Sequence, residues 1–385
     1  MTDDELASRD IQVVTAGRLA SNVGVRLWGP LVPQLAAGFG TSTAAIGAAL
    51  SAGEFAGLLA PVIGVRVDRS RPARVMAGAL VLLSVGALVI ATAPTVVVVG
   101  AALVLVSSSK VFYDTAMGSW IAAQVPYGRR ARVVGLTETS WALSLLVIVP
   151  VLLLIGAASS WRWAVVGVAV VNVTAALVLR SRLGGGATAS GATRVRSQVR
   201  SVLGAWPLFA GVALLMTSSQ FLFVTFSSWL EDDHRLAAAG VSAVSFLIGG
   251  VELVASSATM VLTDRIGKQV SAALGMACMV PGALALTLGS GHLGLGVVAL
   301  AVFIVGFEFA LVSTLPMVTE VRPEARGASL GVTIGMGTLG RGLATLAATA
   351  GYDRWGMTAP SLGALVTTGA AGGMYFAGRH RHGLR

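Results

Sequence analysis

The chain has 385 residues, of which 55% are hydrophobic and only 11% are charged, with a formal net charge of +10. Soluble globular proteins carry roughly 25% charged residues, so the composition excludes an ordinary water-soluble protein. A single cysteine, Cys278, excludes an intramolecular disulfide and a cysteine-based metal cluster. The four histidines have no metal-ligand spacing, and we expect neither a metal nor a cofactor.

Apolar stretches long enough to cross a bilayer recur along the whole chain. A spanning helix needs about 20 apolar residues, and the acidic start of the chain, Met1 to Asp10, is unlike a signal peptide. In chain order, we place the spans at residues 11–38, 44–65, 73–92, 96–123, 133–156, 162–179, 205–230, 239–262, 269–288, 294–318, 327–351 and 358–378. The sequence therefore predicts an all-α membrane protein with twelve transmembrane helices.

Positive charge is concentrated in alternate loops. Arginines and lysines gather at residues 66–74, 129–132, 180–200, 265–268, 322–326 and 379–385, whereas the opposite loops hold only Arg162, Arg235 and Arg354. The positive-inside rule places the basic loops in the cytoplasm, and so both termini as well. This distribution explains the net charge better than nucleic-acid binding does, and it favours a multi-pass protein of a bacterial inner membrane.

The chain divides into two similar halves. Residues 180–204 are rich in arginine, glycine and serine, which is typical of a flexible linker. We therefore expect six-helix bundles over 1–180 and 205–385, joined by a cytoplasmic linker over 181–204. Landmarks repeat between the halves, because Asp68 and Asp264 are 196 residues apart, and so are Gly135 and Gly331. Repeated halves are common in secondary transporters, with the substrate site at the repeat interface near the membrane midplane.

One loop motif is specific enough to suggest a family. The segment Gly64-Val65-Arg66-Val67-Asp68-Arg69, followed by Arg74, resembles the cytoplasmic signature between helices two and three of the major facilitator superfamily. Ser70 replaces the usual glycine, whereas the second copy, Asp264-Arg265, keeps it as Gly267. The resemblance implies the major facilitator fold and a cytoplasmic gate formed by Asp68, Arg69, Arg74, Asp264 and Arg265, to which we add Arg18 and Glu138 near the cytoplasmic ends of their spans.

The fifth span resembles a narrower branch of that family. Gly135 to Gly156, with Trp141 and Pro150 between them, is similar to the antiporter signature of twelve-helix drug:proton antiporters, although most of its glycines are replaced. The following Trp161-Arg162-Trp163 resembles the external end of that helix in the same branch. This resemblance implies export.

Nine ionisable residues fall inside the apolar spans. A charge at the bilayer centre costs at least about 2.5–3.5 kcal/mol, so these side chains are expected to face the interior of the bundle. They are Arg18, Arg26, Glu54, Lys110, Asp114, Glu138, Glu252, Glu308 and Arg341. Five acids and four bases permit near-complete neutralisation, but the sequence leaves the pairing open. The pairs we consider are Glu308 with Arg341, Arg26 with Glu54 or Asp114, Lys110 with Asp114, and Arg18 with Glu138.

Helical spacing places several polar residues on common faces. Arg18, Asn22 and Arg26 are four residues apart on the first span, and Lys110 and Asp114 share a face of the fourth. By resemblance, Lys110 takes the place of a helix-four arginine linked to proton coupling. Proton coupling and cavity charges are therefore assigned to Arg26, Glu54, Lys110, Asp114, Glu252, Glu308 and Arg341, with Asp114 first and Glu308 second as proton carriers.

The expected substrate cavity contains polar and aromatic side chains. We assign Asn22, Tyr113, Gln220, Phe223 and Phe226 to it. The aromatic residues of the seventh span have a second interpretation as ordinary packing or lipid-facing side chains.

Together these patterns favour a proton-coupled exporter of small hydrophobic or amphipathic molecules, working as a monomer by alternating access. Alternatives are a proton-coupled symporter, a flippase for lipid-linked substrates, and a membrane receptor without transport. No nucleophile–base arrangement, phosphate-binding loop or metal-ligand cluster indicates an enzyme.

Overall fold

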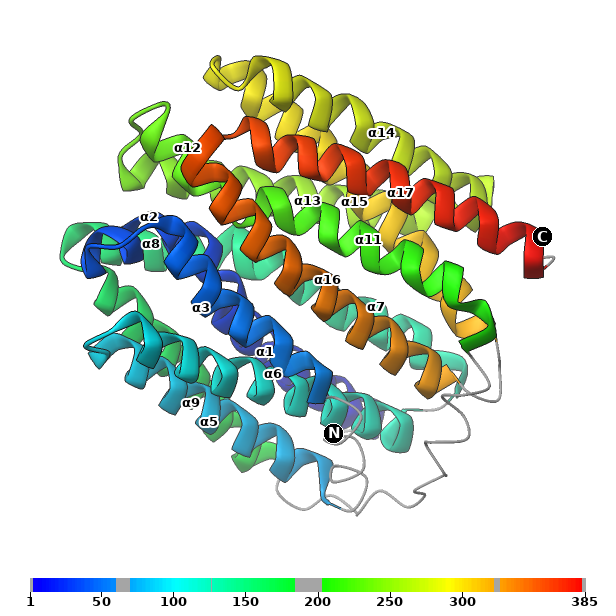
Figure 1. The fold of residues 1–385 in the computed structure, drawn as a ribbon. Coiled ribbons are helices and arrows are strands. Elements are labelled where there is room, and N and C mark those ends of the chain that lie inside the picture. The colour runs from blue at the N-terminus through cyan, green and yellow to red at the C-terminus, as the bar shows by residue number, and fades with distance from the viewer. Residues whose placement is uncertain (1–2, 60–69, 126, 184–202, 322–325, 383–385) are drawn as a thin grey trace.

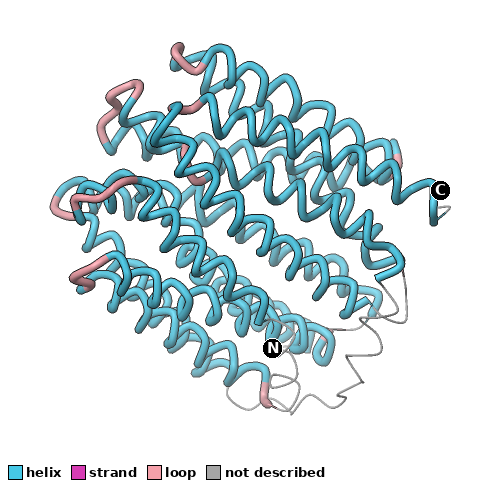
Figure 2. The backbone as a smooth tube through the Cα atoms, viewed as in Figure 1, coloured by secondary structure: helices cyan, strands magenta, loops and turns pink. Residues whose placement is uncertain are grey.

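The computed structural model describes residues 3–59, 70–125, 127–183, 203–321 and 326–382, and these contain helices and no strand (Figures 1 and 2). The N-terminal half, residues 3–183, comprises α1 (Asp3–Arg26), α2 (Trp28–Phe39), α3 (Thr43–Phe55), η1 (Ala56–Leu59), α5 (Pro72–Thr92), α6 (Val96–Gln124), α7 (Tyr127–Leu143), η2 (Ser144–Ile148), α8 (Val149–Ala158) and α9 (Trp161–Leu183). The C-terminal half, residues 203–382, comprises η3 (Leu203–Ala205), α11 (Trp206–Phe223), α12 (Phe226–Asp232), α13 (Ala238–Ile266), α14 (Lys268–Gly289), α15 (Leu293–Glu320), α16 (Arg326–Trp355) and α17 (Thr358–His382). The two halves lie side by side (Figure 1).

Every predicted span coincides with helix over the described residues. Eight of the described helices or helix runs are long and apolar enough to cross a membrane, and the shorter run Thr43–Leu59 is also apolar. The remaining spans, on α1–α2, α16 and α17, are helical but more polar, because they carry arginines or many glycine and threonine residues. The all-α membrane fold is confirmed, and α16 packs against α3 of the other half as well as against α11 and α17 of its own half.

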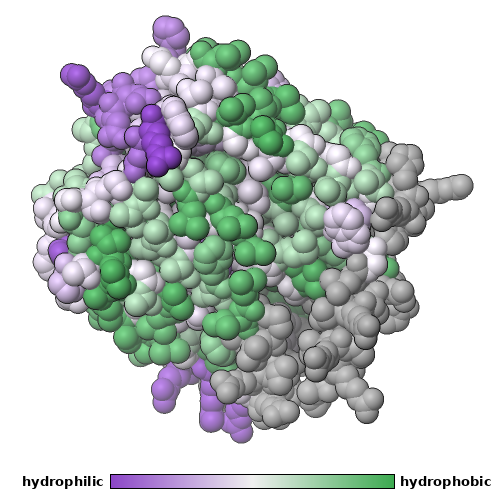
Figure 3. Space-filling view, in the orientation of Figure 1, coloured by the Kyte–Doolittle hydropathy of each residue, from purple (hydrophilic) through white to green (hydrophobic). Residues whose placement is uncertain are grey.

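The outer surface matches a lipid environment. Large apolar side chains such as Leu82, Val85 and Leu88 on α5 are exposed, and a broad apolar belt separates hydrophilic side chains at two edges of the face in Figure 3. Exposed apolar patches of this extent mark membrane contact rather than a water-facing surface.

Two of the predicted spans are interrupted where proline removes a backbone donor. The first span breaks at Leu27, between α1 and α2, because Pro30 cannot donate a hydrogen bond to the carbonyl group of Arg26. The fifth span widens into the π-helical turn η2 just before Pro150. The first break places Arg26 at a helix end, near the middle of the bundle.

The halves are closed at one end. We call the end where α9 finishes and η3 begins the linker end, and the opposite end, with the α2–α3 and α16–α17 connections, the far end. Hydrogen bonds between the halves at the far end join Ala44 N to Asp353 Oδ2 (2.9 Å) and Ser227 Oγ to the Gly29 carbonyl oxygen (2.7 Å). Ser242 Oγ also donates to the Pro150 carbonyl oxygen across the halves, at 3.0 Å and likewise toward the far end.

The hydrophobic core shows the same asymmetry. One cluster of buried side chains runs continuously through both halves. A second cluster, which includes Val14, Met76, Tyr113 and Leu179, contains only residues of the N-terminal half. The halves therefore share a core toward the far end and have separate packing toward the linker end.

Arg162 closes the C-terminus of α5 at the far end. Its Nη1 donates to the carbonyl oxygens of Ala91 (2.6 Å) and Ala93 (3.4 Å), and the guanidinium lies over the ring of Trp161. A cation at a helix C-terminus satisfies orphan carbonyl groups and interacts favourably with the helix dipole.

We expect Arg162→Ala to lower the free energy of unfolding by about 1.5–3 kcal/mol, the usual contribution of hydrogen bonds to a charged group. The measurement is thermal unfolding of the purified protein in detergent. Arg354→Ala is the matched control, since Arg354 is exposed and lies beside the ring of Trp355 at the same end of the protein. Equal stability of the Arg162→Ala protein and the wild type would show that this cap contributes nothing.

Candidate functional site

The buried charges form three groups. The Arg26 cluster consists of Arg26, Glu252 and Glu308. The Arg341 pair consists of Arg341 and Glu54, and the Arg18 cluster consists of Arg18, Lys110, Asp114 and Glu138. The first two groups join the halves, whereas the third lies within the N-terminal half.

Arg26 is held by groups from both halves. Its Nη1 and Nη2 donate to the two carboxylate oxygens of Glu252, at 2.6 and 2.7 Å, and Nη1 also donates to the Trp141 carbonyl oxygen at 3.2 Å. The guanidinium carbon lies 4.6 Å from the centre of the Trp141 ring and 5.6 Å from that of Phe223. The two charged side chains are only 6% and 1% exposed. This is a desolvated, bidentate ion pair with aromatic faces beside the cation.

The Arg341 pair is the second bridge between the halves. Arg341 Nε and Nη2 donate to Glu54 at 3.1 and 2.7 Å, joining the central part of α16 to the last turn of α3. Ser51, one turn from Glu54, donates to the Gly342 carbonyl oxygen at 2.9 Å. These side chains are 23% and 17% exposed, so this pair is less desolvated than the pair made by Arg26.

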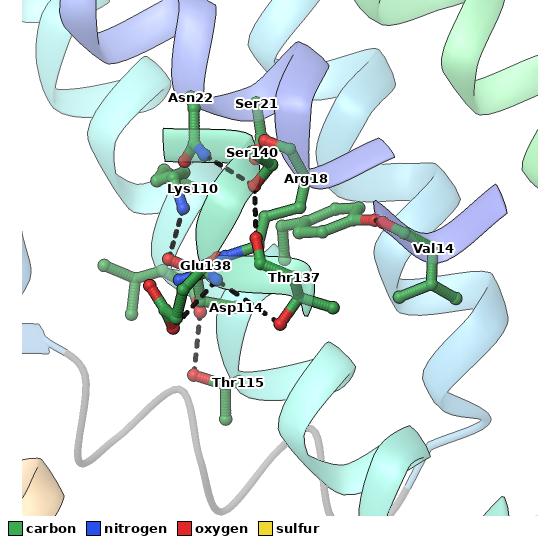
Figure 4. A network of polar contacts seen from close by, with 12 residues as sticks. Val14, Arg18, Ser21, Asn22, Lys110, Asp114, Thr115, Thr137, Glu138 and Ser140 are labelled. Atoms are coloured by element: carbon green, nitrogen blue, oxygen red, sulfur yellow. Dashed lines mark hydrogen bonds and ion pairs between the residues drawn. The ribbon is translucent and has the colours of Figure 1, made fainter. Parts of the chain in front are cut away.

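The Arg18 cluster lies nearer the linker end (Figure 4). Arg18 Nη1 lies 2.8 Å from Glu138 Oε1, and its Nε lies 3.6 Å from Asp114 Oδ1. Lys110 Nζ donates to the other carboxylate oxygen of Asp114. Two acids face two bases here, so the cluster is neutral when all four groups are ionised.

Glu308 takes part in none of these ion pairs. It lies in the central turns of α15, is 5% exposed, and its Oε2 accepts a hydrogen bond from Ser256 Oγ at 2.6 Å. Within the described residues no basic group lies within ion-pair distance of it, although it interacts electrostatically with Glu252 and Arg26. Of the five intramembrane acids, Glu308 alone therefore lacks a cationic partner among those residues.

The ion pairing differs from the alternatives that the sequence suggested. Arg341 pairs with Glu54 rather than Glu308, and Arg26 pairs with Glu252 rather than with Glu54 or Asp114. The physical reason is that the halves meet where α3 packs against α16 and where α13 packs against α7, η2 and α8, which no sequence spacing within one half encodes. The contacts of Arg18 with Glu138 and of Lys110 with Asp114 are present as expected.

The predicted cavity residues occupy varied positions. Tyr113 and Phe226 are fully buried, so neither faces an open space in this structure, and the Tyr113 hydroxyl donates to the Val14 carbonyl oxygen. Asn22 Nδ2 donates to Ser140 Oγ at 3.0 Å, and Gln220 Nε2 donates to Thr345 Oγ1 at 2.9 Å. These four side chains act in packing here. Only Phe223, which is partly buried, contacts the Arg26 cluster.

The predicted gate is described only in part. Asp68 and Arg69 lie outside the described residues, as does the side chain of Asp264. Arg74 and Arg265 are exposed at the linker end. The remaining members, Arg18 and Glu138, form an ion pair within the N-terminal half, so they do not join the halves.

Sequence reasoning missed three side chains of the site. Ser256 hydrogen-bonds Glu308, the Trp141 ring and carbonyl group hold Arg26, and the Phe307 ring lies edge-on to Phe223 with centroids 6.4 Å apart. One signal was available, because Ser256 follows Glu252 by four residues and so shares its helix face.

Two helical halves, closed against each other at one end and bridged by charges in mid-bundle, define a membrane transporter that works between its halves. The sequence profile of the Major Facilitator Superfamily matches residues 14–345. The chain belongs to the Major Facilitator Superfamily, as the loop motif suggested.

Solved structures show the same fold. A bacterial homologue of the human lysosomal transporter Spinster, inward-facing and unoccupied, aligns with a TM-score of 0.81 at 14% identity, over 99% of this chain and 98% of that one. The human organic anion transporter MFSD10 (TETRAN) aligns at 0.72 with 18% identity, over 96% and 99%. The nucleoside transporter NupG aligns at 0.71 with 13% identity, also over 96% and 99%. Comparison with curated proteins finds no match. These likenesses concern the fold.

Proposed function

We propose that this transporter is a proton-coupled exporter of small hydrophobic or amphipathic molecules, related to the drug:proton antiporters. In this proposal it works as a monomer in a bacterial inner membrane, with both termini and the linker 181–204 in the cytoplasm. The far end is then the external side, and the conformation described is closed toward the outside. The loop residues Asp68, Asp264 and their basic neighbours act as the cytoplasmic gate in the opposite conformation.

The uncompensated carboxyl group of Glu308 is the observation that carries this proposal. An isolated charge is costly to bury in a low-dielectric interior, and a buried acid without a basic partner avoids that cost by holding a proton. The sequence favoured Asp114 as the first proton carrier. Asp114 forms ion pairs with Arg18 and Lys110, whereas Glu308 has no such partner among the described residues, so we now place Glu308 first.

Coupling follows from the position of Arg26. The ion pair of Arg26 with Glu252 joins α1 to α13 across the halves, so movement of one half against the other would change the distance from Arg26 to both glutamates. When Arg26 approaches Glu308, the ionised carboxylate is favoured and the proton leaves. When Arg26 returns to Glu252, Glu308 takes up a proton again. Proton uptake and release would then alternate with the conformation.

We expect Glu308→Gln to abolish substrate-dependent proton flux while leaving the protein folded. The measurement uses purified protein in liposomes with an internal pH dye, to which lipophilic cations, neutral drugs and organic anions are added. Asp233→Asn is the control, since Asp233 is an exposed acid at the far end. Normal proton flux through the Glu308→Gln protein would remove Glu308 as the carrier.

The same assay separates the other functions. Proton movement in the same direction as the substrate would indicate a symporter. Stabilisation by a ligand without flux would indicate a receptor. Transfer of a fluorescent lipid-linked substrate between leaflets, with no response to soluble compounds, would indicate a flippase.

A further inference from the structure

The Arg26 cluster contains one more acid than base. Arg26 neutralises Glu252 through both carboxylate oxygens, and Glu308 beside this pair accepts a hydrogen bond from Ser256 alone among the described residues. The groups that interact electrostatically with Glu308 are Glu252 from α13, Arg26 from α1 and Glu138 from α7. Arg341, on the neighbouring α16, is occupied by Glu54. When Arg26, Glu252 and Glu308 are all ionised, the cluster therefore carries one negative charge that no cation among the described residues neutralises.

The protein itself shows how a cation is held here. The Arg26 guanidinium is bound by carboxylate oxygens, by the Trp141 carbonyl group, and by the faces of the Trp141 and Phe223 rings. Carboxylate and aromatic faces together are the usual means of binding an organic cation in a desolvated site.

The aromatic surface extends from Arg26 toward the unpaired acid. Phe223 contacts Arg26 and also packs against Phe307 in an edge arrangement, with 6.4 Å between the ring centroids. Phe307 directly precedes Glu308 in α15. Arg26 lies 5.6 Å from the centre of the Phe223 ring and also interacts electrostatically with Glu308. An apolar group bound against Phe223 would therefore lie in the same charged cluster as the Glu308 carboxyl group.

We infer that the substrates are monovalent organic cations with an aromatic or alkyl body, bound by Glu308 beside Phe223 and Phe307, and that substrate and proton exclude each other there. This inference rests on the proposed transport function and specifies its substrate class. As the cation binds, the Glu308 carboxylic acid gives its proton to water and the resulting carboxylate pairs with the cation, so one positive charge replaces another. An anion would find no free cation among the described residues here, because Arg26 and Arg341 are each engaged by a glutamate.

The test compares two ions of nearly the same shape and opposite charge, tetraphenylphosphonium and tetraphenylborate. Binding to the purified full-length protein in detergent is measured by equilibrium dialysis, and proton release is followed with an indicator in weak buffer. We expect the phosphonium ion to bind with release of one proton per ion. The affinity for the phosphonium ion should fall about tenfold for each unit by which the pH is lowered, in the range where Glu308 is protonated. Tetraphenylborate binding as tight as that of the phosphonium ion, or phosphonium binding independent of pH, would overturn the inference.

Variants locate the site. Glu308→Gln should weaken phosphonium binding at least about tenfold and remove the proton release, whereas Asp233→Asn should change neither. Phe223→Leu should weaken phosphonium binding several-fold through loss of the cation–π contact and keep the proton release, and Phe223→Tyr should retain both. Because Phe223 carries no charge, this pair remains informative if the Glu308 variant is unstable. Wild-type affinity in Phe223→Leu would contradict the assigned position.

The two proposals fail in different ways. Proton flux driven in liposomes by neutral or anionic compounds, with no phosphonium binding, would overturn the cation site and leave proton-coupled transport in place. Phosphonium binding with proton release, but no flux of any compound, would overturn the transport proposal and leave the cation site.

Discussion

Leucine at Gly47 is expected to hold the far ends of the halves apart and to reduce transport by about ten- to a hundredfold. Gly47 of α3 packs against Thr349 of α16, and a Cβ atom at this position would lie 2.7 Å from the Thr349 Cβ. Rotation of the threonine side chain cannot relieve that contact. Overpacking of this kind costs about 1–3 kcal/mol, and each 1.4 kcal/mol changes the ratio of two conformations about tenfold.

The measurement is the distance between spin labels at positions 41 and 354, on opposite halves at the far end, in a Cys278→Ala background. The distribution should shift to longer distances in the Gly47→Leu protein, together with the loss of flux. Gly78→Leu is the matched control, because Gly78 lies on an exposed part of α5 and a Cβ atom there meets nothing within 4 Å. An unchanged distance distribution with normal transport would mean that closure of the far end does not depend on the packing at Gly47.

The second large effect concerns the ion pair between Arg26 and Glu252. Removing one partner of a buried pair leaves an uncompensated charge and costs about 3–5 kcal/mol, whereas replacing both partners by apolar residues is often neutral or stabilising. We therefore expect Glu252→Leu and Arg26→Met each to lower the unfolding temperature strongly. The double variant should recover most of that loss.

Thermal unfolding of the wild type, the two single variants and the double variant in detergent gives the coupling free energy between Arg26 and Glu252. The corresponding cycle for Glu54 and Arg341 should show a smaller coupling, since that pair is more exposed and better screened. Additive effects in the Arg26–Glu252 cycle would show that the two side chains do not stabilise each other. Recovery of stability in the double variant without recovery of transport would separate the structural role of the pair from its function.

The substrate site required information that no single segment of the chain contains. Lys110 and Asp114 were assigned to one face because their separation of four residues acts within one helix. The partners of Arg26 and Arg341 were not assigned, because Glu252 is 226 residues from Arg26 and Glu54 is 287 residues from Arg341. Helical periodicity has no bearing on contacts between segments so far apart.

The sequence by itself determined that the chain lies in a bilayer, where its helices run and which family it belongs to. Hydropathy and positive charge are properties of single segments, and the motif around Asp68 lies in one short stretch of the chain. It also determined which residues are costly to place in a membrane, among them Glu308. Only the tertiary structure decided which of those charges neutralise one another, because that depends on how α3 meets α16 and how α13 meets α7, η2 and α8 between the halves. That arrangement leaves Glu308 as the acid without a basic partner among the described residues, and it makes an otherwise unremarkable glutamate the centre of the proposed mechanism.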